Sequence, residues 1–169
     1  IIFTRKHFFA LHLIMDCPIY TKLAAQYAEL FPLKAARVKW NLSTETAESM
    51  ICFLPVMQTD VFLRYQEKVL IIDTKYYGKT MQSKFNKLSF HSQNMYQIFS
   101  YVKNQDAAGT GNVAGVLLYA KTQEAVTPDS SFVIGGNPIS VKTLEITYWR
   151  CRAIFIDCID FHYCNIFNI

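Results

Sequence analysis

The sequence predicts a mixed α/β fold, a central mixed β-sheet flanked by helices, and three patterns point to it. Apolar residues spaced three and four apart indicate helices over about 17–31 and 92–104. Two strand-like runs on either side of residues 66–67 indicate a hairpin. A continuous apolar run over 113–120 and a further run near 139–146 indicate buried strands. Helices and strands that alternate along one chain favour layers over a helical bundle.

The first helix has start and end signals. Asp16 can cap it, Pro18 suits its first turn, and Pro32 lies beyond its end. Its apolar positions are Ile19, Leu23, Tyr27 and Leu30. Residues 33–50 then predict an irregular connector with a short extended piece around 38–42.

The centre of the chain carries an arm, the second helix and a loop. Residues 76–90 are polar, basic and aromatic, and predict an exposed arm. Ser92 begins the second helix. The apolar stripe of that helix consists of Met95, Ile98, Phe99 and Val102. Residues 106–112, which include Gly109 and Gly111, predict a loop before the buried strand.

The composition predicts one folded domain. The 169 residues are 51% hydrophobic and 18% charged, which excludes a disordered chain. The formal net charge of +4 favours a polyanionic partner without identifying one. The chain begins without Met, so we expect a fragment of a longer protein.

The cysteines and the apolar segments indicate the cellular compartment of the protein. Five cysteines without C-x-x-C spacing argue against a secreted disulfide framework, so we expect a cytoplasmic protein. We expect no signal peptide, because Arg5 and Lys6 break the apolar start of the chain. We expect no membrane span either, because Asp157 and Asp160 interrupt the apolar run over 153–169. No G-x-x-x-x-G-K-[ST] loop is present, so any nucleotide chemistry belongs to a partner.

The hairpin brings together a group of charged side chains. A turn at residues 66–67 places Asp60 opposite Asp73, with both carboxylates on one face. Strand alternation adds Lys75 to that face. Facing carboxylates destabilise a sheet pair unless a cation compensates them, so the pattern predicts a Mg²⁺ site, with Mn²⁺ as a possible substitute.

The chemistry suited to this group is phosphodiester hydrolysis. Asp60 and Asp73 would bind the metal ion, with the backbone carbonyl of Thr74 as a further ligand. Lys75 would orient the attacking water and offset charge in the transition state. The alternative is that Asp60, Asp73 and Lys75 are ordinary residues at strand ends, since D-x-K occurs by chance in many proteins.

The motifs around this group resemble those of the PD-(D/E)XK nucleases, and within them the McrC-like subunits of modification-dependent restriction systems. The resemblance covers about residues 18–146. The matching segments are LPVMQTD (54–60), LIIDTKYY (70–77), HSQNMYQIFSYVKN (91–104), LLYAK (117–121) and ISVKTL (139–144). Several separated motifs in the right order are more specific than any one of them.

The resemblance implies a restriction-endonuclease-like domain over 1–169, with its core at about 17–146 and divergent ends at 1–15 and 147–169. It implies that Asp60 and Asp73 are metal ligands and Lys75 the catalytic lysine. It also implies a DNA endonuclease that acts on double-stranded, methylated DNA with a McrB-like AAA+ GTPase, and no membrane partner.

The second helix carries a further motif of the resemblance. Gln97 and Tyr101 match the Q-x-x-x-Y element of RecB-like nucleases, whose side chains help to organise the site and the DNA strand. Four residues apart, they share one helix face with Asn94, which we expect to contact DNA. Without the resemblance, the polar flank of an amphipathic helix would be the better explanation.

The arm is the expected DNA-binding surface. Lys79, Lys84 and Lys87 stand among Tyr76, Tyr77, Phe85 and Phe90, which suits phosphate contacts with aromatic support. The alternative is a solvated loop whose aromatic side chains pack inward.

One departure from the family pattern concerns activity. McrC-like proteins usually have a metal-binding glutamate in the first helix, where this chain has Thr21. Thr21 can hold a metal-bound water but adds no negative charge. The alternative function is therefore a catalytically impaired nuclease-fold module that binds DNA or the GTPase partner.

Four of the five cysteines have a one-plus-three arrangement like that of nucleases with an iron–sulfur cluster. Cys17 precedes the core, and Cys151, Cys158 and Cys164 follow it, but the spacing does not match. His162 adds little to a zinc site, so buried or incidental cysteines are favoured.

Overall fold

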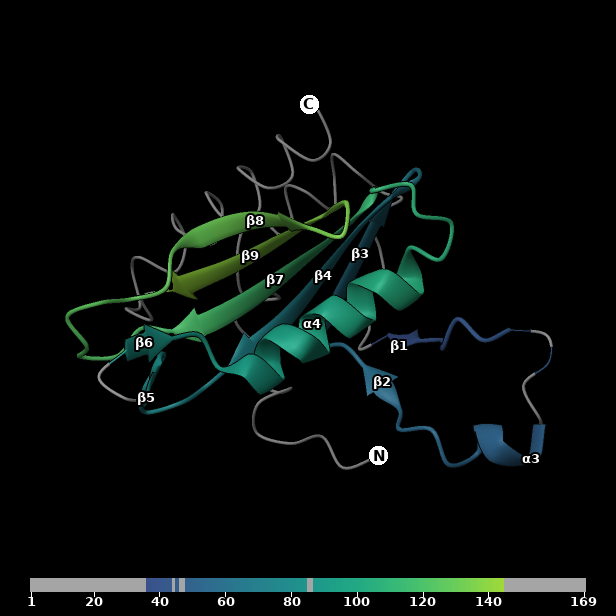
Figure 1. The fold of residues 1–169 in the computed structure, drawn as a ribbon. Coiled ribbons are helices and arrows are strands. Elements are labelled where there is room, and N and C mark those ends of the chain that lie inside the picture. Colours follow the sequence, from purple (N-terminus) through teal and green to yellow (C-terminus); the bar gives the residue numbers. More distant parts are fainter. Residues whose placement is uncertain (1–35, 44, 46–47, 85–86, 145–169) are drawn as a thin grey trace.

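The computed structural model describes residues 36–43, 45, 48–84 and 87–144, and its core is one mixed sheet with a helix across one face (Figure 1). The helices are α3 (Glu48–Ile51) and α4 (Ser92–Gln105). The strands are β1 (Arg37–Val38), β2 (Met57–Gln58), β3 (Val61–Tyr65), β4 (Lys68–Lys75), β5 (Gln82–Lys84), β6 (Lys87–Ser89), β7 (Val113–Ala120), β8 (Ser130–Ile134) and β9 (Asn137–Leu144).

The five-stranded sheet has the order β3-β4-β7-β9-β8. Its three central strands run parallel, and an antiparallel strand closes each edge. This confirms the expected α/β architecture with a central mixed sheet. Among the described residues α4 is the one long helix, and whether the core is restriction-endonuclease-like stays a prediction.

The hairpin forms in the predicted register. Val61 pairs with Ile72 and Tyr65 with Lys68, so the turn lies at residues 66–67, where Gln66 adopts a positive φ of 50°. β4 extends past the start of β3 as far as Lys75. The last residues of β4 therefore stand beyond the hairpin ladder, where side chains from other segments can reach them.

Helix α4 packs on the sheet through the predicted apolar stripe. Ile98 and Val102 are fully buried, and Met95 and Phe99 pack against the same core. The helix approaches β7 closely at Gly115, where a Cβ atom would lie 2.7 Å from side-chain carbons of Ile98 and Val102. Glycine is thus needed at this position because the helix occupies the space of a side chain.

Several sequence-based boundaries need correction. The piece expected around 38–42 is the two-residue β1, which pairs with β2, and the connector also contains the short α3. The last strand begins at Asn137, not at residue 139. Strand β8 was not predicted, because its five residues are mostly exposed and show no alternation of buried and exposed positions.

The arm was predicted to be exposed, but the structure shows it to be only partly exposed. It contains the short β5–β6 hairpin, and its Thr80 is completely buried while Phe90 packs against the core. Tyr76 and Leu88 remain exposed. The expected helix at 17–31, Thr21, and the cysteines other than Cys52 lie outside the described residues, and Cys52 itself is exposed and free.

The loop before β7 is organised by one buried carboxylate. Asp106 accepts hydrogen bonds from the backbone and hydroxyl of Thr110, from the backbone of Gly111 and from the Asn137 amide, at 2.7–2.9 Å. Burial alone would raise the pKa of Asp106, but these four donors outweigh it and lower the pKa to about 2. The loop thus depends on an ionised carboxylate.

In the described part of the chain, no helix has both the length and the apolar character needed to cross a membrane.

We expect Gly115→Ala to destabilise the fold by about 1–3 kcal/mol, because the added methyl group must displace Ile98 and Val102. Urea unfolding measures the change. Gly78→Ala is the matched control, since nothing lies within 4 Å of its added Cβ and its φ is not positive. Equal stability of the two variants would contradict the close packing of α4.

We expect acid to weaken the fold through Asp106. Its folded-state pKa of about 2 lies below the ordinary 3.8, so its stabilising effect is present above pH 3.8 and is lost as the pH falls towards 2. Asp106→Asn places an NH₂ group against N–H donors, lowering stability at neutral pH and flattening this acid limb. Parallel curves of unfolding free energy against pH would refute the assignment.

Candidate active site

Asp73 and Lys75 lie at the carboxyl end of β4, on the face covered by α4. Both are buried, with exposed fractions of 3% and 8%. The parallel register places them opposite Leu117 and Tyr119 of β7, so neighbouring strands surround them. A charged pair in this position needs partners for both charges.

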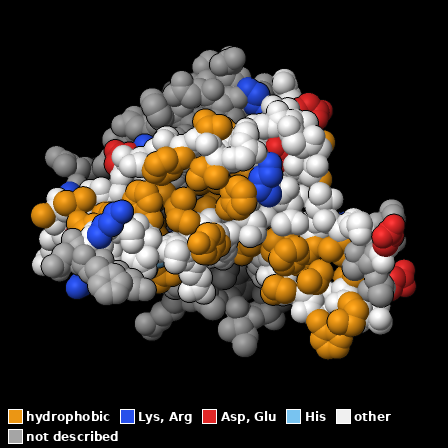
Figure 2. Space-filling view, viewed as in Figure 1, with side chains coloured by type: hydrophobic (Ala, Val, Ile, Leu, Met, Phe, Trp, Pro, Cys, Tyr) orange, Lys and Arg blue, Asp and Glu red, His pale blue; other side chains and the backbone are white. Residues whose placement is uncertain are grey.

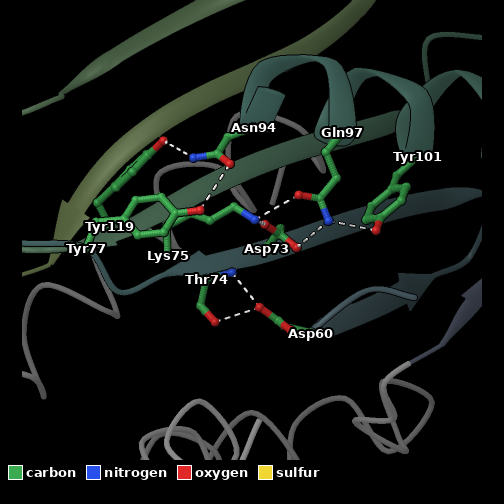
Figure 3. Close-up of polar contacts among 9 residues, drawn as sticks. All are labelled: Asp60, Asp73, Thr74, Lys75, Tyr77, Asn94, Gln97, Tyr101 and Tyr119. Carbon is green, nitrogen blue, oxygen red and sulfur yellow. Dashed lines mark hydrogen bonds and ion pairs between the residues drawn. The ribbon is translucent and has the colours of Figure 1, made fainter. Parts of the chain in front are cut away.

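Helix α4 supplies those partners through Gln97 (Figure 3). The Lys75 Nζ forms an ion pair with Asp73 Oδ2 and donates a 2.8 Å hydrogen bond to Gln97 Oε1. The Gln97 amide nitrogen donates to the Tyr101 hydroxyl at 2.8 Å and makes a longer 3.5 Å contact with Asp73 Oδ1. The four predicted residues therefore form one connected polar group.

Asp60 makes contacts with β4 that the sequence did not predict. It immediately precedes β3, and its Oδ2 accepts hydrogen bonds from the Thr74 backbone N–H at 2.7 Å and the Thr74 hydroxyl at 2.6 Å. The register, with Val61 opposite Ile72, agrees with the expected position of Asp60 across from Asp73, and the binding of one metal ion by both carboxylates stays a prediction. Asp60 thus sits beside the group around Lys75 and continues the hydrogen bonding of β4 past the point where β3 begins.

Asn94 belongs to a second polar group one turn earlier on α4. It is 4% exposed, its amide nitrogen donates to the Tyr119 hydroxyl at 2.8 Å, and its carbonyl accepts from the Tyr77 hydroxyl at 3.3 Å. His91 lies against the rings of both tyrosines. The expected DNA contact of Asn94 would require these internal bonds to be exchanged.

Sequence reasoning assigned no role to Tyr119 or His91. Tyr119 lies within an apolar run that reads as core, and only the strand pairing places its hydroxyl beside α4. Burial raises the pKa of Tyr119, as it does that of Tyr101, although a side-chain hydrogen bond opposes the rise in each case. Both phenols therefore stay protonated and can act as hydrogen-bond donors at neutral pH.

The predicted DNA-binding lysines are only partly described. Lys79 and Lys87 are exposed, as a phosphate contact requires, whereas the side chain of Lys84 lies outside the described part. On the face shown in Figure 2, Lys and Arg side chains are scattered among hydrophobic ones and form no continuous patch. No group of three or more His, Cys, Asp or Glu residues that could hold a metal ion occurs among the described residues.

A comparison with curated proteins finds the Type IV methyl-directed restriction enzyme EcoKMcrBC of Escherichia coli strain K12. The two sequences are 33% identical over 115 residues, which is 68% of this chain and 32% of that protein. The chain thus spans about a third of the length of this relative. No protein-family model matches the chain.

We expect Lys75→Met to destabilise the fold by about 3–5 kcal/mol at neutral pH, because it leaves Asp73 as a buried charge without its cation. Lys142→Met is the matched control. It breaks an ion pair with Asp129, whose side chain is 74% exposed, and should cost less than about 1 kcal/mol. Equal costs in urea unfolding would show that the Lys75–Asp73 pair is solvated.

Proposed function

Since this chain is a McrC-like relative of the EcoKMcrBC restriction enzyme, we propose that it is a metal-dependent DNA endonuclease subunit of a McrBC-type restriction system. The observation that carries the proposal is the placement of the Lys75 ammonium between Asp73 and Gln97 at the carboxyl end of β4. The proposed reaction is hydrolysis of a phosphodiester bond. The nuclease assignment to the PD-(D/E)XK superfamily belongs to this proposal.

The donors at this end of β4 fit a magnesium ion. Asp60 and Asp73 offer hard carboxylate oxygens, and Mg²⁺ binds through one or two carboxylates while it keeps water molecules. The backbone carbonyl of Thr74, which follows Asp73 and is hydrogen-bonded to Asp60 through its N–H, is the further proposed ligand. When bound, the ion would supply positive charge to the phosphate and acidify an attacking water.

Lys75 is the group best placed to act on the reacting atoms. An ammonium has three N–H donors, and the contacts to Asp73 and Gln97 use two of them. The third can bond to a phosphate oxygen or to the attacking water. The position of the ammonium is restricted on both sides, so little reorganisation would be needed in the transition state.

Gln97 and Tyr101 would keep this geometry in place. Tyr101 accepts the hydrogen bond of the Gln97 amide nitrogen, which turns the Gln97 carbonyl oxygen towards Lys75. A glutamine without this contact could present its NH₂ group to the ammonium instead. We therefore assign Tyr101 an indirect role in holding Lys75.

We further propose that the substrate is double-stranded, methylated DNA, because the relative is a methyl-directed enzyme. The exposed lysines of the arm would contact its phosphates. The proposed partner is a McrB-like AAA+ GTPase, and a cytoplasmic location stays a prediction.

The test is a cleavage assay with the purified chain, a McrB-like GTPase, GTP, Mg²⁺ and methylated DNA. We expect Asp73→Asn to lower the cleavage rate by at least about a hundredfold, because it removes a metal ligand and the counter-charge of Lys75. Asp129→Asn is the control, as it neutralises an exposed carboxylate elsewhere. Equal cleavage by the two variants would refute the proposal.

The second candidate is a nuclease-fold module with impaired or absent catalysis that binds DNA or the GTPase. The observation that favours it is that the described residues contain two acids at this site and no cluster of three metal-binding side chains. The same assay separates the two candidates. A wild-type chain that binds DNA or the partner but never cleaves supports the module.

A further inference from the structure

Outside the group around Lys75, another carboxylate makes several hydrogen bonds to a segment that sequence analysis assigned to DNA binding. Glu124 follows β7, and its Oε2 accepts from the Thr80 backbone N–H at 2.5 Å, the Thr80 hydroxyl at 2.7 Å and the Thr122 hydroxyl at 2.9 Å. Thr80 belongs to the arm and has no exposed surface. The arm is thus attached to the loop that follows β7.

The topology explains why these two segments meet. β4 and β7 are parallel neighbours, with Lys75 opposite Tyr119, so their carboxyl ends lie at one edge of the sheet. The arm leaves β4 there, and the loop carrying Glu124 leaves β7 beside it. The Glu124–Thr80 contact therefore lies a few residues beyond Lys75 in sequence and at the same edge.

A second set of contacts holds the other end of the arm. Gln82 donates to the Phe90 carbonyl at 3.0 Å and to the Ser89 hydroxyl at 3.2 Å, which closes the β5–β6 hairpin just before α4. The rings of Phe90 and Phe132 are 6.0 Å apart. Since this end is held by the core, the Glu124 contact decides where the first half of the arm, with exposed Lys79, stands.

A carboxylate is an unfavourable neighbour for a surface that binds phosphates, because it repels them. The Thr80 hydrogen bonds, followed by a smaller contribution from the Lys79 charge, hold the pKa of Glu124 below its ordinary value. The carboxylate therefore stays charged at neutral pH beside Lys79. Its hydrogen bonds to the arm give it a role that outweighs this repulsion.

We infer that Glu124 is a positioning residue for DNA binding, which holds the arm through Thr80 so that Lys79 faces the DNA backbone next to the cleavage site. The inference rests on the proposed function for the identity of the ligand. It predicts that removing this negative charge weakens DNA binding, whereas a purely electrostatic effect would strengthen it.

The experiment compares Glu124→Ala with Asp129→Ala, which removes a carboxylate from the same loop but one that contacts Lys142 instead of the arm. We expect amide hydrogen exchange in the arm to rise about tenfold in Glu124→Ala and to stay unchanged in Asp129→Ala. Affinity for a fluorescein-labelled methylated duplex, measured by anisotropy without divalent metal, should fall about threefold to tenfold in Glu124→Ala alone.

The salt dependence distinguishes positioning from general damage. Loss of the Lys79 phosphate contact should lower the slope of log affinity against log salt by about one unit. Thr80→Val, which lacks the hydroxyl, should weaken DNA binding as Glu124→Ala does, and Thr80→Ser, which keeps the hydroxyl, should bind DNA like the wild type. This pair of variants tests the inference even if Glu124→Ala does not fold.

Two results would overturn the inference. One is unchanged exchange in the arm of Glu124→Ala, and the other is DNA binding by Glu124→Ala that is as tight as that of the wild type or tighter. Either leaves the proposed nuclease function intact. A wild-type chain that binds the duplex in the anisotropy measurement but does not cleave it in the assay with the GTPase, GTP and Mg²⁺ would refute the nuclease function and leave the inference standing.

Discussion

A buried ammonium and a buried carboxylate share the face of β4 that α4 covers, and neither is stable there without the other. Lys75 and Asp73 are two residues apart on a strand, so their side chains point the same way and can pair. Gln97 then satisfies the remaining polarity by accepting from Lys75 and approaching Asp73. The structure around this end of β4 therefore keeps these two charges together.

The reach of Gln97 depends on how closely α4 approaches the sheet. Ile98, its neighbour in the helix, packs directly over Gly115. A side chain at that position would lift the helix and move the Gln97 amide away from the ammonium. A backbone feature of β7 therefore sets a polar distance on β4, through the rigid packing of one helix.

Carboxylates organise the loops at the two ends of β7. Asp106 precedes the strand and accepts four hydrogen bonds, while Glu124 follows it and accepts three from Thr80 and Thr122. An ionised carboxylate is effective in this role because it has several acceptor positions and bonds strongly to backbone N–H groups. The end that holds the arm is also the end where Lys75 lies, which links the candidate DNA surface to the candidate site.

The sequence alone determined the local elements with strong patterns. The hairpin register, β7, the stripe of α4 and the shared face of Asp73 and Lys75 followed from turn position, strand alternation and helix spacing. These depend on short-range geometry, which repeats regularly along a strand or helix. The association of Gln97 and Tyr101 with these two residues followed from the family resemblance. The EcoKMcrBC similarity agrees with the family that the motifs indicated.

Only the tertiary structure decided which side chains meet across distant segments. The Oδ2 of Asp60 accepts hydrogen bonds from the backbone N–H and the hydroxyl of Thr74, because β3 begins only after Asp60 and an ionised carboxylate bonds strongly to a backbone N–H group. Asn94 is hydrogen-bonded to Tyr77 and Tyr119, and Thr80 of the arm is hydrogen-bonded to Glu124. Such pairings depend on the order of strands in the sheet, which no local period in the sequence records.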